Sequence, residues 1–538
     1  MTHINSNRRR FLQYVALGTF TGAIPGFAST ENRKLNQMPN SAFKPDVEIA
    51  LTAQTAEVKI LPGTKTRVLK YSGKLLHGPQ TAIRELPGYL GPVLNFEQGQ
   101  KVRLFFHNQL PEPCVTHWHG MHVPQIMDGH PMYAIEQGEQ YVYEFEVKNP
   151  AGTNWYHSHT HEMTARQVYQ GLAGLITITD EAERKLDLPG GEFDLPLVIQ
   201  DRSFSSGNQL HYSLTMHQRM QGFLGDTILV NGQHNHVIPV KTRAYRLRIL
   251  NGSNARIYKL GWSDGSPLTA IGTDGGLLEK PEIFPYIMLA PAERVELWVD
   301  FGGRKTGTEL ALQTLPFQGA AMGMGGGRGG GMRGGGMGMR GGAAEQGSQD
   351  TLVKFAIIEQ VGDSPRLPDT LIPMQPLTVS NAANPDRVVS INIGMHRMTF
   401  NLNGRTFDML DYTEQEKIPL NTVQKIRISN ISPAMGGGMR GGRGGGGGMM
   451  GMMAQPHPIH LHGQQFRILS RRPGYADGAY ATIKDGLINS GWKDTVLVMP
   501  GEEIEIIKPF MDYTGLFLYH CHNLEHEDMG MMRNFMVG

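Results

Sequence analysis

The sequence predicts an all-β protein built from several β-sandwich domains. Short segments rich in Val, Ile, Leu, Thr and Tyr recur along the 538 residues, bounded by Gly, Pro, Asn and Asp, as is typical of strands joined by tight turns. Long helical periods are scarce. The first and last thirds of the chain also repeat the same short motifs, which indicates two copies of one folding unit.

The expected strands follow one another from the first third into the middle third of the chain. They alternate apolar and polar residues, as half-buried strands do. The clearest are 102–106, 141–147, 175–179, 245–250 and 295–299. The best candidates for short helices are 181–186 and 413–416.

Length and charge set the overall organisation. A chain of 538 residues is long enough for three or four domains with cores of their own. We place them at 45–180, 190–360 and 375–538. The formal net charge of +1 gives no overall attraction to nucleic acid or to an anionic membrane, so neither is expected as a partner of the mature form.

The first residues resemble an export signal. Arg8, Arg9 and Arg10 precede a short apolar run that ends near Ala28, which predicts a twin-arginine signal over 1–28, recognised by the twin-arginine export machinery. The mature protein is then expected in the periplasm. An uncleaved membrane anchor is the alternative, but glutamine, glycines and Pro25 interrupt the run.

The segment 519–532 reads Tyr-His-Cys-His-Asn-Leu-Glu-His-Glu-Asp-Met-Gly-Met-Met and carries the strongest chemical signal. On a strand, His520 and His522 would share one face while Cys521 takes the other. A thiolate, two imidazoles and a distant thioether are the ligands of an electron-transfer copper. The segment offers all but the second imidazole: Cys521, His526, and one of Met529, Met531 and Met532. The alternative is a buried Cys521 with incidental histidines.

Four His-x-His pairs occur in similar motifs, and on strands each would place two imidazoles on one face, about 7 Å apart. The pairs are His117 and His119, His157 and His159, His460 and His462, and His520 and His522. Single pairs mean little, but four beside a thiolate set predict a metal cluster. The middle third has one further pair, His234 and His236, which we interpret as a surface turn after Asn231-Gly232.

The repeat explains where the metal sites should lie. His-Trp-His-Gly at His117 matches His-Leu-His-Gly at His460, and Trp-Tyr-His-Ser-His at Trp155 matches Leu-Tyr-His-Cys-His at Leu518. Two sandwich units would each give two strands to one shared cluster. Because Ser158 replaces the cysteine in the first copy, only the last domain can hold a thiolate copper. The middle domain would hold the other two in register.

The second cysteine, Cys114, has no disulfide partner if Cys521 binds copper. Its position three residues before His117 invites a catalytic role. A small buried or partly exposed thiol is the favoured interpretation.

Together, His-Trp-His-Gly, His-x-His, His-Pro-x-His-x-His-Gly and His-Cys-His-x3-His-x4-Met resemble the four signatures of the multicopper oxidases, in particular their bacterial laccase-like and copper-efflux oxidase (CueO-like) members. The resemblance implies three cupredoxin-like Greek-key β-sandwich domains, with a trinuclear site between the first and the third. It also implies four copper ions: one type 1, one type 2 and two type 3.

Carried over motif by motif, the resemblance assigns His457, Cys521 and His526 to the type 1 copper, with Met531 axial. It assigns His117 and His460 to type 2. The type 3 pair would take the six remaining histidines: His119, His157, His159, His462, His520 and His522. Electrons would pass from Cys521 to the adjacent His520 and His522.

Three acidic residues match positions near the copper sites. Asp128 and Glu527 correspond to the acidic residues that the family places near the cluster, and are candidates for proton relay. Each could instead be a simple surface carboxylate. Asp494 is a candidate for orienting a ligand from outside the coordination sphere.

The resemblance implies an oxidase that takes single electrons from Cu(I) and/or phenolic reductants and reduces O2 to water, in support of copper tolerance. A ferroxidase or manganese oxidase on the same scaffold is the alternative. The alternatives without enzyme activity are an exported copper-sequestering protein and a cell-division protein of cupredoxin fold.

Two insertions of low complexity, 321–342 and 434–454, consist of glycine with methionine and arginine, and such a composition cannot form a core. Because a thioether binds soft Cu(I), their methionines are candidate substrate ligands, although both segments could be simple linkers. The candidates are Met322, Met324, Met332, Met337, Met339, Met435, Met439, Met449, Met450, Met452 and Met453. In the efflux oxidases acidic residues of the methionine-rich region help to bind substrate copper, whereas Met453-Ala454-Gln455 before His457 contains no carboxylate.

Overall fold

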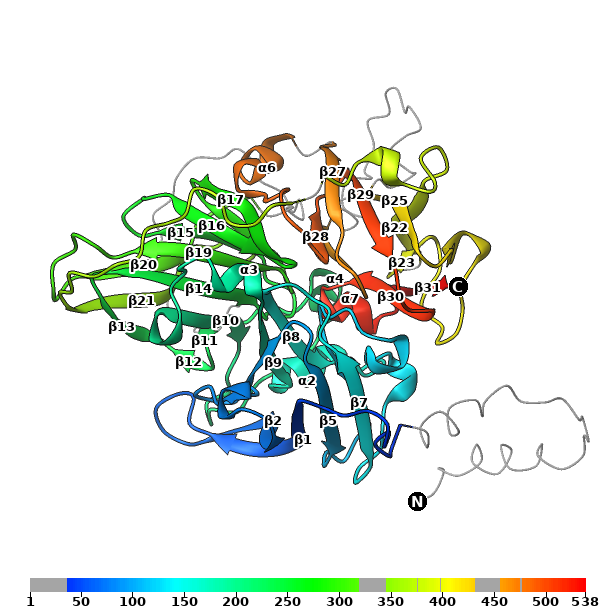
Figure 1. Cartoon of the computed structure of the whole chain (residues 1–538), viewed down its shortest axis with the longest axis horizontal. Helices are drawn as coiled ribbons and strands as arrows, with labels where there is room; N and C mark the ends of the chain where they lie inside the picture. Colours follow the sequence, from blue (N-terminus) through cyan, green and yellow to red (C-terminus); the bar gives the residue numbers. More distant parts are fainter. Residues whose placement is uncertain (1–35, 319–344, 375, 397, 431–454, 475–476) are drawn as a thin grey trace, which may run out of the picture.

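The structure, a computed structural model, describes residues 36–318, 345–374, 376–396, 398–430, 455–474 and 477–538. The predicted export signal and both methionine-rich insertions lie outside these residues. The described strands form six sheets, which pair into three β-sandwiches (Figure 1). This confirms the all-β fold class and the three sandwiches that the sequence predicts.

The first sandwich packs a four-stranded sheet, in the order β2-β1-β5-β7, against a five-stranded sheet, in the order β3-β4-β9-β8-β6. Its core is aliphatic and aromatic, and includes Val47, Leu104, Phe106, Tyr143 and Ile176. Its elements are β1 Val47–Val58, β2 Thr66–His77, η1 Gln80–Ala82, β3 Ile83–Arg84, β4 Val93–Glu97, β5 Lys101–Asn108, β6 Thr116–His117, η2 Gln125–Met127, η3 Pro131–Tyr133, β7 Gln140–Glu146, β8 Gly152–Ser158, α2 Thr164–Gln170 and β9 Ala173–Thr179.

The second sandwich packs a seven-stranded sheet, β12-β11-β10-β14-β19-β16-β17, against a five-stranded sheet, β13-β21-β20-β15-β18. Its elements, with the α3 helix that precedes it, are α3 Glu181–Arg184, η4 Gly191–Phe193, β10 Asp194–Arg202, α4 Met216–Gln221, β11 Thr227–Val230, β12 Gln233–His234, β13 Val237–Lys241, β14 Ala244–Asn251, β15 Tyr258–Trp262, β16 Leu268–Thr273, β17 Gly276–Phe284, β18 Ile287–Leu289, β19 Arg294–Asp300, β20 Glu309–Thr314 and β21 Asp350–Glu359.

The third sandwich pairs the sheets β23-β22-β25-β29-β27 and β24-β31-β30-β26-β28. Cys521 and Met531 belong to its buried core. Its elements are η5 Val379–Asn381, β22 Val389–His396, β23 Thr399–Leu402, η6 Glu414–Glu416, β24 Lys417–Ile418, β25 Thr422–Ser429, β26 His457–Leu461, β27 Arg467–Arg472, α6 Asp477–Ala481, η8 Lys484–Gly486, β28 Thr495–Val498, β29 Glu503–Phe510, β30 Gly515–Cys521, α7 Leu524–Asp528 and β31 Met532–Val537.

All five strands expected from alternation are present, as β5, β7, β9, β14 and β19. The two expected helices are the short α3 and the single 3₁₀ turn η6. The pair His234 and His236 lies at the turn between β12 and β13, with Asn235 in the left-handed conformation at φ 53°, so the surface-turn interpretation is confirmed. Helices α2, α4 and α7 were not expected, because seven or fewer residues carry little periodicity.

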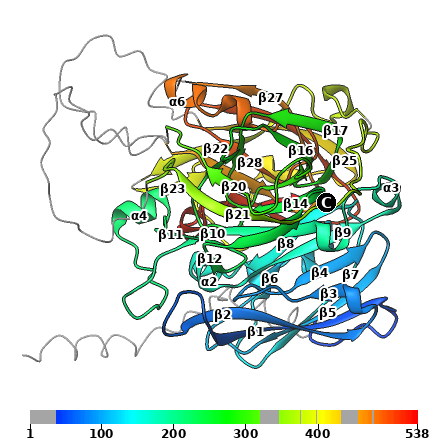
Figure 2. The same ribbon diagram turned by 90° about the vertical axis from the view of Figure 1, so that its left-hand side faces the viewer.

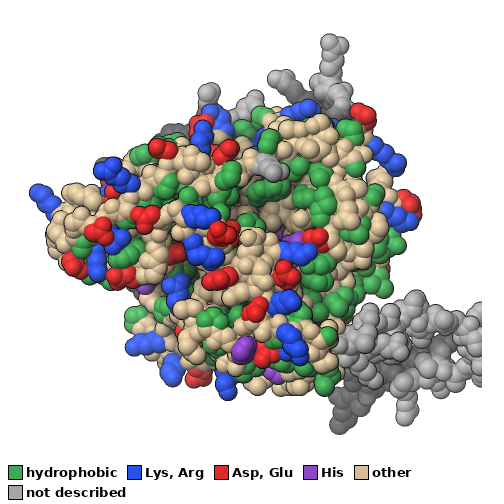
Figure 3. Space-filling view, viewed as in Figure 1, with side chains coloured by type: hydrophobic (Ala, Val, Ile, Leu, Met, Phe, Trp, Pro, Cys, Tyr) green, Lys and Arg blue, Asp and Glu red, His purple; other side chains and the backbone are tan. Residues whose placement is uncertain are grey.

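The three sandwiches bring the histidine-bearing strands together. In Figures 1 and 2 the first sandwich lies below the third. The ring of His520 in β30 lies 5.0 Å from that of His159, which directly follows β8. Acidic and basic side chains are interspersed over the face shown in Figure 3, in line with the near-zero formal charge. None of the helices in the described ranges has the length and apolar character needed to cross a membrane.

Candidate metal centre

Each His-x-His pair straddles the end of a strand. His117, His157, His460 and His520 lie within β6, β8, β26 and β30, and the second histidine of each pair follows the strand. Antiparallel pairing sets His117 opposite His157 in the first sandwich. It sets His460 opposite His520 in the third. The repeat that the sequence shows is therefore a repeat of strand register, and it gathers four imidazoles on each side of the domain boundary.

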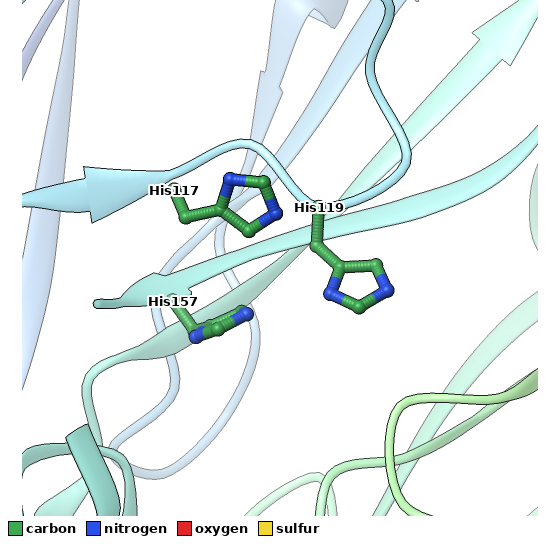
Figure 4. Close-up of side chains that lie close together, drawn as sticks. All are labelled: His117, His119 and His157. Atoms are coloured by element: carbon green, nitrogen blue, oxygen red, sulfur yellow. The ribbon is translucent and has the colours of Figure 1, made fainter. Parts of the chain in front are cut away.

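The eight imidazoles form one buried cluster between the first and third sandwiches. His117 stacks on His462 with ring centroids 3.9 Å apart, and His119 stacks on His460 at 3.7 Å. The Nε2 atom of His520 lies 3.3 Å from that of His159 and 3.2 Å from that of His462. Figure 4 shows three of these rings close together on the side of the first sandwich, those of His117, His119 and His157.

In several rings one nitrogen is hydrogen-bonded and the other is not. This difference shows whether the cluster fits metal ions. One nitrogen of most rings donates to a fixed oxygen: His117 Nδ1 to Asp128 O at 2.5 Å, His157 Nδ1 to Ser158 O at 2.8 Å, His460 Nδ1 to Asp494 O at 2.9 Å, His119 Nε2 to Asp494 Oδ1 at 3.0 Å, and His520 Nδ1 to Cys521 O at 3.1 Å. The opposite nitrogens of His117, His119, His157 and His460 are buried and have no hydrogen-bond partner among the described residues. Metal-binding histidines use this division of roles, so the residues fit the metal.

Sets of three of these side chains place their ligand atoms within 4.8 Å of one another. The sets are His117 with His119 and His157, His117 with His460 and His462, and His159 with His462 and His520. The rings of His119 and His157 also lie 5.1 and 5.3 Å from that of His522. The structure therefore brings together every histidine predicted for the cluster.

Burial favours the uncharged form of most of these imidazoles. It lowers the pKa of His157 to about 4 and that of His159 to about 3, and it holds the pKa of His117, His119 and His460 well below the usual value. A neutral imidazole has the lone pair that a metal ligand needs. The site is therefore ready to bind metal at neutral pH without losing protons from these rings.

A second donor set lies inside the third sandwich. The Sγ atom of Cys521 is 3.4 Å from His457 Nδ1 and 3.7 Å from His526 Nδ1, and all three side chains are buried. Met531 is fully buried in the same core, and its backbone oxygen accepts from the Cys521 N–H at 3.0 Å. Phe400 packs against both imidazoles. One thiolate and two imidazole nitrogens in this arrangement suit an electron-transfer copper.

Asp128 and Glu527 are buried at the cluster and are not surface carboxylates. Asp128 Oδ2 accepts from His462 Nδ1 at 2.7 Å, and Glu527 Oε2 lies 3.1 Å from His520 Nδ1. Burial raises the pKa of Asp128 well above its ordinary value. Burial would raise the pKa of Glu527 too, but electrostatic contact with His159 and His520, together with hydrogen bonding to His520, stabilises the ionised carboxylate and holds the pKa low. The pKa values of these two buried carboxyl groups are therefore shifted in opposite directions, upward for Asp128 and downward for Glu527.

The structure reveals further residues that orient the ligands. Asp494 bonds His119 through its side chain and His460 through its backbone, as the sequence suggested. Arg294 of β19 was missed; its guanidinium donates to both carboxylate oxygens of Asp494, at 2.7 and 2.5 Å. Met220 of α4 was missed as well, and its backbone oxygen accepts from His526 Nε2 at 3.0 Å. Neither lies near a histidine motif, so no local signal could have found them.

Cys114 is a buried free thiol, as favoured above. Burial raises its pKa to about 12, which suits a structural thiol and not a nucleophile.

Three β-sandwiches, a buried thiolate–imidazole site in the third and an eight-histidine cluster between the first and third define a copper-binding oxidoreductase of cupredoxin-like fold. Sequence profiles described as multicopper oxidase match residues 56–183 and 380–538. The chain belongs to the multicopper oxidase family, and it is an oxidase that uses O2.

Individual relatives agree with this assignment. The chain is 31% identical over 524 residues to the multicopper oxidase mco of Staphylococcus haemolyticus, covering 94% of this chain and 95% of that protein. It is 30% identical over 516 residues to a laccase of Bacillus stratosphericus, covering 85% and 90%. The crystal structure of the McoA multicopper oxidase of Aquifex aeolicus superposes with a TM-score of 0.73 at 31% identity, covering 92% and 97%.

Proposed function

We propose that this oxidase takes single electrons from Cu(I) and/or small phenolic reductants and serves copper tolerance outside the cytoplasm. It would hold four copper ions: type 1 at His457, Cys521 and His526 with Met531 axial, type 2 at His117 and His460, and two type 3 ions at the six other histidines. The observation that supports this proposal most directly is the position of Cys521. It belongs to the thiolate site, whereas the adjacent His520 and His522 belong to the histidine cluster.

Bound copper would supply one-electron acceptance at Cys521 and the four-electron reduction of O2 to water at the cluster. The chain supplies the connection, since the path from Cys521 Sγ to either neighbouring imidazole is wholly covalent. It also supplies groups for protons. Asp128 Oδ1 is buried without a hydrogen-bond partner among the described residues, and a carboxyl of raised pKa beside His462 can hold and release a proton there.

Cu(I) as a reductant is supported by composition and by position. The insertions supply eleven methionines, whose thioethers suit a cuprous ion. Gln346 comes shortly after the first insertion and Gln455 directly after the second. Both residues line a pocket together with Pro456 and Pro458, which flank His457. The chain thus returns from both insertions close to the thiolate site.

The predicted export signal supports a role outside the cytoplasm. The arginines at 8–10 followed by a short apolar run suit the twin-arginine machinery, which would deliver the protein to the periplasm. A sequestering or cell-division role without enzyme activity would need neither Cys521 nor four histidine pairs at one cluster.

Steady-state oxidation of Cu(I), Fe(II), Mn(II) and a phenol on one copper-loaded preparation tests the proposal. We expect the highest kcat/KM for Cu(I) or the phenol. Deleting 321–342 and 434–451 should lower Cu(I) oxidation about tenfold or more and leave oxidation of a bulky organic dye within about twofold, because only Cu(I) needs soft thioether ligands. Equal losses for both substrates would make the segments linkers, and preferred oxidation of Fe(II) or Mn(II) would favour the alternative functions.

A further inference from the structure

Lys508 occupies a position of β29 at which the strand pattern calls for an apolar residue. Alternation along β29 puts it on the same face as Ile504, Ile506 and Phe510, and those three side chains belong to the buried core of the third sandwich. Lys508 is itself only 1% exposed. Lysine is almost never fully buried unless it is paired, so its place on the core face is unusual.

The buried ammonium of Lys508 has no carboxylate partner. Its Nζ donates to the backbone oxygen of Gln464, and with the described residues it makes no ion pair and no other hydrogen bond. Lys493, which is 3% exposed, instead pairs with Asp274 at 3.1 Å and with Glu293 at 3.2 Å. An ammonium has three N–H donors, so Lys508 keeps two of them for water.

A cavity adjoins Lys508 and is also lined by His122 and His462. Its volume of about 20 Å³ is enough for one water molecule, which needs roughly 10–15 Å³. We name it the Lys508 cavity. Its half-buried lining residues, which place it directly beneath the surface, are Gly463, Gln464, Pro509, Met511 and Tyr513.

The Lys508 cavity offers a donor and an acceptor to that water. The ring of His122 is buried, and its Nε2 donates to the Asp512 carboxylate at 2.8 Å, which leaves Nδ1 as an acceptor. That Nδ1 has no partner among the described residues. Because buried polar atoms are rarely left without partners, we expect a water that accepts from Lys508 Nζ and donates to His122 Nδ1.

On its inner side the Lys508 cavity borders the histidine cluster. His462, which lines it, donates through Nδ1 to Asp128 Oδ2 at 2.7 Å, and Asp128 Oδ1 is buried without a partner among the described residues. Lys508 and Asp128 influence each other electrostatically although no ion pair joins them. They therefore lie near each other without contact, and one water can bridge such a gap.

From this arrangement we propose that Lys508 supplies protons to Asp128 for the reduction of O2 and is itself recharged by water bound in the Lys508 cavity. The inference deepens the proposed function and rests on it, since that function already uses Asp128 to hold a proton. Lys508 acts through Asp128 and not on the reacting atoms.

The electrostatics support a lysine that changes its charge near neutral pH. Burial lowers the pKa of Lys508 to about 7, although the carboxylates of Asp494 and Asp128 oppose this shift. The charged and the neutral form are then both populated at neutral pH, as a proton donor requires. The titratable groups that face Lys508 are Asp128, Asp494, His122, His462 and Tyr513.

The proton transfers balance. One Nζ–H bond of the ammonium breaks, and its proton goes across the bridging water to Asp128, which leaves a neutral amine. The amine takes a proton from a hydronium ion that reaches the Lys508 cavity from solvent, and water remains. Four such transfers, with four electrons from the reductant, convert one O2 into two waters.

Two variants separate proton supply from charge. Lys508→Met keeps the length of the side chain and removes its charge, whereas Lys508→Arg keeps the charge on a group that does not release a proton. We expect both to slow reoxidation of the reduced, copper-loaded enzyme by O2 about tenfold or more at pH 6. Reduction of the type 1 copper by hexacyanoferrate(II) should stay within about twofold. Stopped-flow absorption measures both rates.

The pH profile is a readout that a merely structural role would not move. In the parent enzyme the reoxidation rate should fall about tenfold from pH 6 to pH 8, because fewer Lys508 side chains then carry the proton. In both variants it should be flat within about twofold. Lys425→Met is the matched control, because Lys425 is half-buried in the neighbouring strand β25 and does not line the Lys508 cavity. It should keep the parental rate and profile.

Titration of Lys508 itself is a readout apart from turnover. In the copper-loaded enzyme, held reduced and free of oxygen, lysine labelled with ¹³C and ¹⁵N should give one side-chain NMR signal that titrates near pH 7 and is missing in Lys508→Met. A Lys508 signal that titrates at the usual lysine value of about 10.4 would overturn the inference.

The kinetics can overturn it as well. A parental reoxidation rate in either Lys508 variant would do so, and so would a slower variant that keeps the parental pH profile. If Lys508→Met does not fold, Lys508→Arg and the titration of the parent enzyme decide the question. Failure of the parent enzyme to reduce O2 with hexacyanoferrate(II) would instead count against the proposed function.

Discussion

At the scale of single residues, Cys521 distinguishes the last sandwich from the first. The equivalent Ser158 directs its hydroxyl to Gln167 and, at 3.1 Å, to Thr160, so the first sandwich has a hydrogen-bonded core where the third has a thiolate site. A hydroxyl is a poor ligand for a soft metal. One substitution in a repeated motif therefore decides where electrons enter.

Replacing this sulfur tests its role. We expect Cys521→Ser to abolish the intense blue absorption of the type 1 copper and all oxidase activity, because no other thiolate lies near His457 among the described residues. Visible absorption, copper content and turnover measure the effect. Cys114→Ser is the matched control and should remain blue and active; a blue Cys521→Ser protein would refute the assignment.

Asp128 is the second test at this scale. Asp128→Asn keeps the shape of the side chain and removes the titratable oxygen beside His462. We expect reoxidation by O2 to slow about a hundredfold while reduction of the type 1 copper remains fast, as stopped-flow absorption would show. A reoxidation rate equal to that of the parent would remove Asp128 from the proton path.

At the scale of elements, two short helices enclose the thiolate site. α7 carries His526 and Glu525, and the Glu525 carboxylate accepts from Tyr212 at 2.7 Å and from the Phe223 N–H at 3.0 Å. These bonds tie the segment that contains α4 to α7. The middle sandwich thereby orients a ligand in the third.

Gly222 ends α4 at φ 86°, where an added Cβ would lie 2.2 Å from Ala255 and 2.5 Å from Asn523. We expect Gly222→Ala to lower the free energy of unfolding by about 2–4 kcal/mol through strain and overpacking, and to alter the type 1 absorption as Met220 moves away from His526. Thermal unfolding and visible spectra report both.

Gly207 is the matched control in the same region, because a Cβ there would meet only Ser205 Oγ at 3.9 Å. Gly207→Ala should leave stability and spectrum unchanged. Equal stability of the two variants would contradict the proposed packing of α4.

At the scale of the whole molecule, Arg294 joins the three sandwiches. It starts β19 in the second, donates to Thr153 O of the first at 3.0 Å, and pairs with Asp494 of the third. All of these groups are buried. We expected the middle sandwich to hold the other two in register, and the Arg294 side chain makes contacts that do so. Asp494, which Arg294 holds, in turn hydrogen-bonds His119 and fixes its ring.

Arg294→Met should destabilise the protein by about 3–5 kcal/mol, because it leaves Asp494 buried without its cation. We also expect copper loss from the cluster before loss of the blue absorption, measured by metal analysis and spectroscopy. Arg304→Met is the control, since its ion pair with Asp264 is partly exposed and worth at most about 1 kcal/mol. Retained cluster copper in the Arg294 variant would count against this linkage.

Much of this arrangement could be predicted from the sequence, since alternation, turn residues and histidine motifs are local signals. Strands such as β5 and β14 and the histidine pairs were identified in that way. The contacts of Arg294, Met220 and Glu525 could not be, because each joins residues more than a hundred positions apart and no periodicity marks them.

The sequence by itself determined the set of copper-binding side chains, the repeat and the position of the single thiolate. Which side chains can bind copper depends on residue types and short spacings, and both can be seen in the sequence. Only the tertiary structure decided which ring nitrogen of several imidazoles, such as those of His117 and His460, is free of hydrogen bonds, and which side of the thiolate site is closed. Those features depend on backbone oxygens and side chains from other domains, and a chain has no local way to encode them.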